Sequence, residues 1–448
     1  MKVGTVRAAS GSHWVSLLVV AVVSLFGAGE ANAAGEGLRV GALKLDARLG
    51  TEFGFNSNVQ ANSGSDGSVA QLNLRPSLNL STPASGLMQV NAGAGLGWRQ
   101  YLLVPDGQQD QSAPDFGGIF ALKFNPGGAF SFTPSDQLRI SSPPNPSPSG
   151  EPITAVSNEA GAELGFHPGG SAAKARLGFS ALAKGSYGFL QYSNGDGYDF
   201  RDKGVGKGRG ELRYNFLPRT AASFVATVED NVFKTANSKV GGGEGSGEGS
   251  GIELSNINTT PIRLFLGGDT LLSAQLEVAV ELGTAFVEYG SIDKPSAFVG
   301  NARATYYLSR RNTLSFEYLR DFADAARYSW VQFDRVSVKY GTSDQLFDAS
   351  ARVAASFRNF GPDQQDPLVT TTTDLVASAE GRVGFKVAKG VLAGFKYVFE
   401  TRSGSAEGVV DASGAGTGDA ADLITAGDLT KINEYTRHQA YFTVDLKY

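Results

Sequence analysis

The sequence predicts an all-β protein, a transmembrane antiparallel β-barrel of the bacterial outer membrane with about 18 strands. Three observations predict it. Apolar and polar residues alternate with a period of two along many segments, as they do in a strand with one apolar and one polar face. The connections between these segments alternate between short and long, and the segments are even in number. Bacterial outer-membrane barrels combine an even strand number with short periplasmic turns and longer outer loops.

The alternation defines the expected strands in chain order. In residues 43–55 every second residue is Leu, Ala, Thr or Phe, and the residues between them are charged or glycine. The same pattern returns in residues 70–80 and 88–98, and the last segment, residues 440–448, alternates up to Tyr448. The expected strands are residues 38–55, 69–81, 87–101, 116–125, 129–140, 159–167, 173–190, 208–216, 220–233, 260–267, 273–287, 297–308, 313–321, 328–340, 345–358, 372–387, 390–401 and 436–448.

Two places interrupt the pattern. Pro76 lies within an expected strand on its apolar face and lacks the N–H that a sheet needs, which predicts a β-bulge there. Residues 328–340 change phase between Phe333 and Val336, which predicts a second bulge. A large soluble all-β protein is the alternative, because its strands also alternate. We prefer the membrane barrel because many apolar positions are alanine or glycine and the connections alternate strictly in length.

The N-terminal residues 1–33 read as a secretory signal peptide. Lys2 and Arg7 precede an apolar run over residues 14–26, and Ala31-Asn32-Ala33 matches the small-residue cleavage pattern. An N-terminal membrane anchor is the alternative, but a run of about a dozen apolar residues is short for a spanning helix. We therefore expect the signal peptide to be removed and residues 34–448 to form a single barrel domain, without a plug domain before the first strand.

The composition indicates which kinds of function to expect. The chain has no cysteine, 58 glycines and a net charge of −5, and this charge argues against a nucleic-acid partner. His167 and His438 lack the surroundings of a catalytic dyad or metal cluster, and the paired Glu277 and Glu281 are expected among many other charges. The glycine-rich residues 206–210 and 241–251 read as flexible loops. We therefore predict no enzyme activity, cofactor or metal site.

Charged residues of the clearest strands all fall on the polar face. In a barrel this face lines the interior, so these residues are the candidate lumen lining. A plain water-filled pore, whose charges are only solvated and paired across strands, is the alternative to a specific binding role. Tyr101, Tyr307 and Tyr441 are isolated aromatic candidates on the same face. The candidate lining comprises Lys44, Asp46, Arg48, Glu52, Arg75, Lys174, Arg176, Glu277, Glu281, Asp348, Arg352, Glu380, Arg382, Lys386, Lys396, Asp445 and Lys447.

The last strand also carries a candidate assembly signal. In a closed barrel the last strand pairs with the first, so no sheet edge remains. Outer-membrane proteins often end in such a strand with a terminal aromatic residue, and Phe442 and Tyr448 resemble that sorting signal. The expected partners are accordingly the barrel assembly machinery and the outer-membrane lipid, including lipopolysaccharide.

One stretch resembles a known family. Phe55-Asn56-Ser57-Asn58-Val59, which leads into a long loop, is followed by Pro76-Ser77-Leu78-Asn79-Leu80 in the next strand, and the two together resemble the β-barrel porin type-2 family, with Asn56 where an aspartate is usual. The resemblance implies passage or docking in the export of a surface polysaccharide, beside a periplasmic polysaccharide-export protein. A general or nutrient diffusion porin is one alternative. The other is a structural outer-membrane anchor of a trans-envelope complex such as gliding motility machinery.

Overall fold

The chain forms one closed antiparallel barrel. In this computed structural model the described residues are 37–58, 68–83, 86–104, 112–142, 154–168, 178–193, 202–234, 237–240, 252–255, 258–287, 298–323, 330–361, 369–408 and 435–448. A 19-stranded sheet contains the barrel, and without the short β1 it leaves 18 barrel strands. In the part of the chain that the structure describes, no helix is long and apolar enough to cross a membrane. The predicted fold class and strand number are confirmed.

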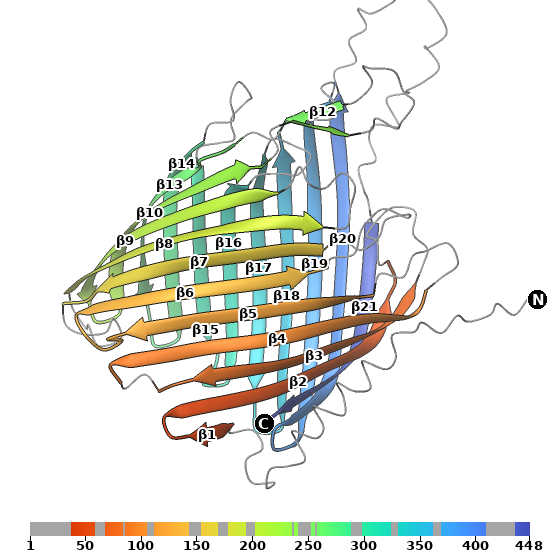
Figure 1. Ribbon diagram of the computed structural model, residues 1–448, viewed down its shortest axis with the longest axis horizontal. Helices are drawn as coiled ribbons and strands as arrows, with labels where there is room; N and C mark the ends of the chain where they lie inside the picture. The colour runs from red at the N-terminus through yellow and green to blue at the C-terminus, as the bar shows by residue number, and fades with distance from the viewer. Residues whose placement is uncertain are drawn as a thin grey trace, which may run out of the picture.

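The barrel strands follow each other in chain order (Figure 1). They are β2 (Leu43–Asn56), β3 (Val69–Ser81), β4 (Met88–Leu103), β5 (Ala113–Phe124), β6 (Phe130–Ser141), β7 (Thr154–Phe166), β8 (Gly178–Ser193), β9 (Lys203–Leu217), β10 (Thr220–Phe233), β13 (Ile262–Leu271), β14 (Leu276–Phe286), β15 (Phe298–Tyr307), β16 (Asn312–Ala323), β17 (Val331–Ser343), β18 (Phe347–Phe360), β19 (Val369–Ala388), β20 (Val391–Gly408) and β21 (Tyr435–Lys447).

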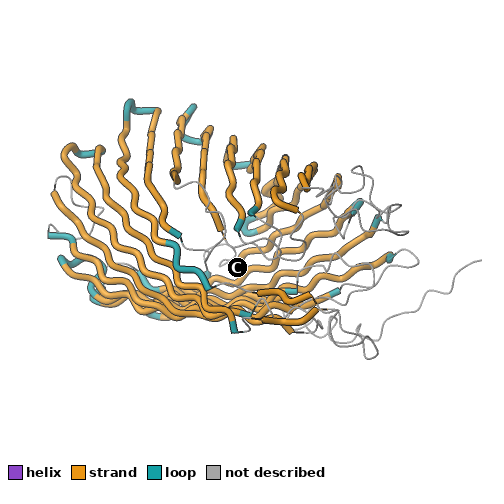
Figure 2. Tube along the Cα trace, turned by 90° about the horizontal axis from the view of Figure 1, so that it is seen from above, coloured by secondary structure: helices purple, strands orange, loops and turns teal. Residues whose placement is uncertain are grey.

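Strand β21 closes the barrel against β2. Their antiparallel register runs from the Arg48–Lys447 pair to the Asn56–Gln439 pair. In Figure 1 strands β2 to β10 form the front wall and cross the direction of β14 to β21, which form the rear wall. The two directions differ because the strands of a barrel tilt relative to its axis. Figure 2 shows the wall curving as seen from above. Closure gives both neighbours to every barrel strand, so the barrel has no open sheet edge.

Two short hairpins were not predicted. Residues 38–55 do not form one strand: β1 (Leu38–Val40) folds back on β2, with Val40 opposite Leu43. Gly41 between them has a φ of 63°, a left-handed conformation that glycine adopts without strain. A second hairpin, β11 (Asn237–Val240) with β12 (Ile252–Ser255), forms a separate two-stranded sheet in the connection that follows β10.

The barrel buries polar side chains and exposes apolar ones. On its outer face Phe53, Leu78 and Val353 are 52%, 49% and 61% exposed. On its inner face Gln71 and Asn73 are only 5% and 7% exposed. A soluble protein does the reverse, because water favours polar surface. The inverted arrangement is what a barrel in a hydrocarbon environment requires.

Neither predicted bulge lies where it was expected. The pairing of β3 with β4 skips Arg75 and Pro76 and then resumes in the same register, and the shift instead lies between Ala70 and Gln71. A proline lacks a donor but adds no residue, so β3 loses two pairs with β4 and keeps its register. In β17 the pairing with β16 and β18 is continuous through Phe333 and Val336.

The apparent phase change in β17 has a different cause. Unbroken alternation puts Asp334 on the outer face together with Val336, and Phe333 on the inner face. Arg320 of β16 lies opposite Asp334, and its Nη1 approaches Oδ2 to 3.1 Å. Tyr318 also donates its hydroxyl to Asp334 Oδ1 at 2.6 Å. These contacts neutralise a carboxylate on the outer face, so no bulge is needed to turn it inward.

The glycine-rich residues 206–210 are strand and not loop. They lie within β9, where Gly206, Gly208 and Gly210 point outward and Lys207 and Arg209 point inward. The prediction was wrong because composition was given more weight than the two-residue period. The other glycine-rich stretch, residues 241–251, lies outside the described residues.

Candidate functional site: the polar inner face

The structure brings most of the predicted lining residues together on the inner face. Several of them form ion pairs across strands. Lys386 Nζ lies 3.0 Å from Asp348 Oδ1, and Arg382 pairs with Asp445. Arg352 and Glu380 are opposite each other in the β18–β19 register, and Arg48 is opposite Lys447. Lys174 and Arg176 lie outside the described residues.

A first cluster lies on the inner side of the closing seam. Glu52 of β2 uses both carboxylate oxygens. Its Oε2 lies 3.4 Å from Arg75 Nη2 and accepts a hydrogen bond of 3.2 Å from Asn73 Nδ2, and its Oε1 lies 3.5 Å from Lys396 Nζ. Beside it Tyr441 accepts a hydrogen bond of 2.9 Å from Gln71 Nε2. These residues line a polar cavity of about 220 Å³. The cluster therefore joins the first strands of the barrel to the last ones.

The paired glutamates of β14 are tied to the next strand. Glu277 accepts a hydrogen bond from the Tyr307 hydroxyl at 3.0 Å and lies 3.7 Å from Arg303 Nη2. Glu281 accepts one from Asn301 Nδ2 at 2.7 Å. These contacts engage each carboxylate separately, as expected for structural pairing across strands. Lys44 and Asp46 form an ion pair within β2, with Lys44 Nζ 3.0 Å from Asp46 Oδ1.

The sequence analysis missed a pair of arginines around one carboxylate. Asp374 of β19 accepts bonds from Arg358 of β18, Nε to Oδ1 at 2.6 Å and Nη2 to Oδ2 at 2.5 Å. Arg402 of β20 adds a third, Nε to Oδ2 at 2.7 Å. A bidentate guanidinium–carboxylate contact is geometrically specific. Asp374 lies within the expected strand 372–387, so following the alternation of that strand to its first residues would have placed Asp374 on the inner face.

A second missed group follows β9. Three of its inward basic residues reach a carboxylate. Lys207 Nζ lies 2.7 Å from Glu159 Oε2, Arg209 Nη2 lies 2.9 Å from Glu211 Oε2, and Arg213 Nη1 lies 2.6 Å from Asp269 Oδ1. On β13, Arg263 Nε lies 2.8 Å from Asp321 Oδ1. Two inner-face cavities of about 420 and 380 Å³ border these strands and share residues of β14 to β16. The inner face is thus hollowed along a continuous arc of strands.

Cations on this face are generally more exposed than the acids that they bind. Arg75 is 60% exposed and its partner Glu52 is 15% exposed. Arg303 is 54% exposed and its partner Glu277 is 36% exposed, and Arg358 is 29% exposed and its partner Asp374 is 1% exposed. The longer basic side chains extend over carboxylates held near the wall. Four pairs are exceptions, because Arg263, Arg382, Lys386 and Arg437 are each less exposed than the acid that they bind. At most of the printed inner-face pairs the basic group is therefore the partner nearer to the lumen.

The remaining candidates are placed as follows. Tyr101 and Tyr441 are buried on the inner face. His438 lies on the outer face, where its Nδ1 is 2.7 Å from the Tyr397 hydroxyl, and the backbone N–H of His167 donates to Ala129 O in a short turn. Among the described residues no group of His, Cys, Asp and Glu side chains could hold a metal ion.

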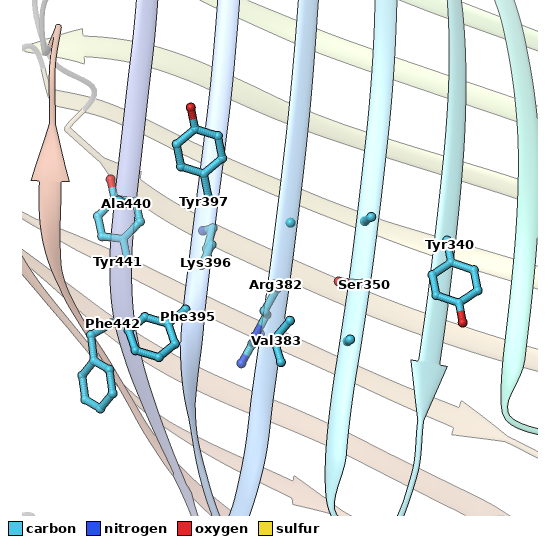
Figure 3. Close-up of a pocket in the computed structure, with 13 residues that line it drawn as sticks. Tyr340, Ser350, Arg382, Val383, Phe395, Lys396, Tyr397, Ala440, Tyr441 and Phe442 are labelled. Carbon is cyan, nitrogen blue, oxygen red and sulfur yellow. The ribbon is translucent and has the colours of Figure 1, made fainter.

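The outer face near the closing seam carries an apolar groove of about 660 Å³. Figure 3 shows Tyr340 of β17 on one side and Phe395, Tyr397 and Phe442 on the other. The floor between them is made of small residues: Ala349, Ala351, Gly381 and Ala440. Phe442 meets Phe395 edge to face, with ring centroids 5.6 Å apart, and the Tyr448 N–H donates to Ala47 O at 2.9 Å. The two candidate assembly residues thus contact neighbouring strands on both sides of β21.

Comparisons with known proteins found likenesses of structure only. No protein-family model matches the sequence, and no curated protein matches it. The structure is similar to OccAB4 from Acinetobacter baumannii, with 10% identity, a TM-score of 0.45 and coverage of 90% of this chain and 98% of that one. A BenF-like porin from Pseudomonas fluorescens Pf-5 is 10% identical, with a TM-score of 0.44 and coverage of 91% of this chain and 100% of that one. A bacterial polysaccharide outer membrane secretin is 9% identical, with a TM-score of 0.35 and coverage of 92% of this chain and 100% of that one. With TM-scores below 0.5, these likenesses do not decide the function, and the resemblance to the porin type-2 family stays a prediction.

Proposed function

We propose that this barrel lies in the outer membrane of a Gram-negative bacterium and conducts small hydrophilic solutes, with a preference for anions. The observation that carries the proposal is the exposure of the inner face: Arg75, Arg209 and Arg303 extend 60%, 42% and 54% of their surface, whereas their carboxylate partners lie closer to the wall. The outer face supports the location, because side chains such as Phe357 and Phe395 are 59% and 64% exposed.

The mechanism follows from electrostatics at short range. At pairs such as Arg75 with Glu52 and Arg303 with Glu277, a solute in the lumen meets the guanidinium group before it meets the carboxylate. Charged groups separated by more than about 8 Å are screened at physiological ionic strength, so the nearest groups dominate. Walls of one net sign also raise the local concentration of the opposite ion. Many weak sites along the path favour passage over tight binding.

Planar-bilayer recordings test the proposal. The purified barrel should conduct, and its reversal potential in a KCl gradient should show a preference for chloride over potassium. Neutralising Arg75, Arg209 and Arg303 together to glutamine should lower or reverse that preference. Arg219→Gln is the matched control, because Arg219 lies exposed in the short turn between β9 and β10. A folded barrel that does not conduct, or one that prefers cations, would contradict the proposal.

Polysaccharide export and an anchoring role remain predictions from the sequence. A deletion strain separates them from solute conduction. Impaired uptake of one class of anionic nutrient, with a normal surface glycan, supports the channel. Loss of a surface glycan with normal uptake supports export beside a periplasmic polysaccharide-export protein. Lost motility or a missing envelope complex, with both glycan and uptake normal, supports the anchor.

A further inference from the structure

Two basic side chains of the lumen wall stand directly opposite each other. Lys339 of β17 and Arg352 of β18 are paired in the register of these strands, and both are exposed on the inner face. Opposite residues of an antiparallel pair have Cβ atoms about 5 Å apart, and like charges at that spacing are destabilising. Within the part of the chain that the structure describes, neither side chain forms an ion pair or a hydrogen bond. The positive charge of this pair is therefore open to the lumen.

The strands on either side offer one carboxylate for the two cations. Lys339 is flanked on β16 by Ser315, whose side chain is neutral. Arg352 is flanked on β19 by Glu380, which is exposed and is not ion-paired with it. One carboxylate neutralises at most one of the two cations. The row of Lys339, Arg352 and Glu380 across three strands therefore keeps a positive excess.

A second like-charge pair on the same wall is arranged differently. Arg382 of β19 and Lys396 of β20 are also directly opposite each other, and Figure 3 shows them on adjacent strands. Each has its own acid, because Arg382 pairs with Asp445 and Lys396 Nζ lies 3.5 Å from Glu52 Oε1. Among the described residues Lys339 has no such partner. That difference points to a negative group that comes from outside the chain.

The pair borders one of the inner-face cavities. Ser337, the inward residue next to Lys339 on β17, lines the cavity of about 380 Å³ together with Arg335. Arg335 is exposed and, among the described residues, forms no ion pair. Glu317 also lines the cavity and accepts a hydrogen bond of 3.3 Å from the Ser337 hydroxyl. Because the charges of the cavity are mixed, the place where cations outnumber acids is its edge at Lys339 and Arg352.

We propose that Lys339 and Arg352 bind a phosphate group, either the free ion or the phosphoryl group of a small solute. A guanidinium group offers parallel N–H donors to two oxygens of a phosphate, and an ammonium group adds a point charge. A phosphoryl group carries about −1.5 to −2 charge near pH 7, so one compact group balances both cations, whereas chloride balances one and a dicarboxylate spreads its charges over two ends. The inference rests on the anion channel proposed above and names the class of anion.

Isothermal titration calorimetry on the folded barrel in detergent tests the site independently of conduction. The probes are inorganic phosphate and glucose 6-phosphate in a chloride buffer, with succinate and glucose as control ligands. Lys339→Gln and Arg352→Gln should each weaken phosphate binding about tenfold, because each removes a charge-assisted contact. Glu380→Gln should strengthen binding, because it removes the carboxylate that competes for Arg352. Arg139→Gln is the matched control, since Arg139 is an exposed inner-face arginine flanked by uncharged residues of β5 and β7.

The pattern across these variants decides the outcome. Weaker binding in both cation variants, stronger binding in Glu380→Gln and unchanged binding in Arg139→Gln support the site. Binding of inorganic phosphate assigns it to the free ion, and binding of glucose 6-phosphate alone assigns it to a phosphorylated solute. Absence of binding to the folded barrel, equal binding of succinate, or an equal loss in Arg139→Gln would overturn it. Bilayer recordings separate the two proposals, since a barrel that binds phosphate without conducting refutes only the channel, and one that conducts chloride without binding phosphate refutes only the site.

Discussion

Asp374 shows what a single inner-face residue contributes. Its side chain is 1% exposed, and guanidinium groups from strands on either side of β19 converge on it. A buried carboxylate is costly unless charged donors surround it, and three donated bonds here meet that need. The cluster fixes three neighbouring strands to one another at the end of the barrel where the long connections begin.

Replacing Asp374 by asparagine should destabilise the barrel. The variant loses charge-assisted bonds worth about 1.5–3 kcal/mol and leaves Arg358 and Arg402 close together without a counter-charge. Urea unfolding in lipid vesicles, followed by the loss of the compact band on unheated gels, measures the change. Asp348→Asn is the control, because Asp348 is 38% exposed and solvent can replace its contact with Lys386. If both variants unfold alike, the arginine pair is not a structural fastening.

Strand β14 shows the two faces within one element. Leu282 points outward and is 51% exposed, and Ala279 points inward into a polar cavity. Leu282→Arg should destabilise the barrel by about 2–4 kcal/mol if its depth is near the bilayer centre. Ala279→Arg should be tolerated, because water and the nearby Glu277 and Glu281 accept the charge. Equal losses from the two substitutions, measured by the same unfolding assay, would show that the faces are wrongly assigned.

The whole barrel has a polarity along its axis. Consecutive antiparallel strands put all short turns at one end and all long connections at the other. A membrane barrel keeps the short turns in the periplasm. An epitope inserted after Gly245, in a long connection, should therefore be detected on intact cells. The same epitope inserted at Arg310, between β15 and β16, should be detected only after the outer membrane is opened. The opposite labelling would invert the orientation.

The sequence by itself determined the fold class, the strand number and the side to which most residues point. A two-residue period is a property of one extended segment, so it can be read locally. It would have been read correctly in β9 as well, where Lys207 and Arg209 alternate with glycine. It misled where an exception had a partner elsewhere, as for Asp334, whose outward position depends on Arg320 of another strand.

Only the tertiary structure decided which groups meet. Glu52 and Lys396 are separated by 344 residues and come together because β21 closes against β2. The three-way contact at Asp374 needs the registers of two strand pairs at once. The outward position of Asp136 likewise follows from pairing with β5 and β7, since a weakly patterned strand has no reliable phase of its own. Register and closure are non-local, and a shift of one residue would exchange the two faces, so neither can be read from one segment alone.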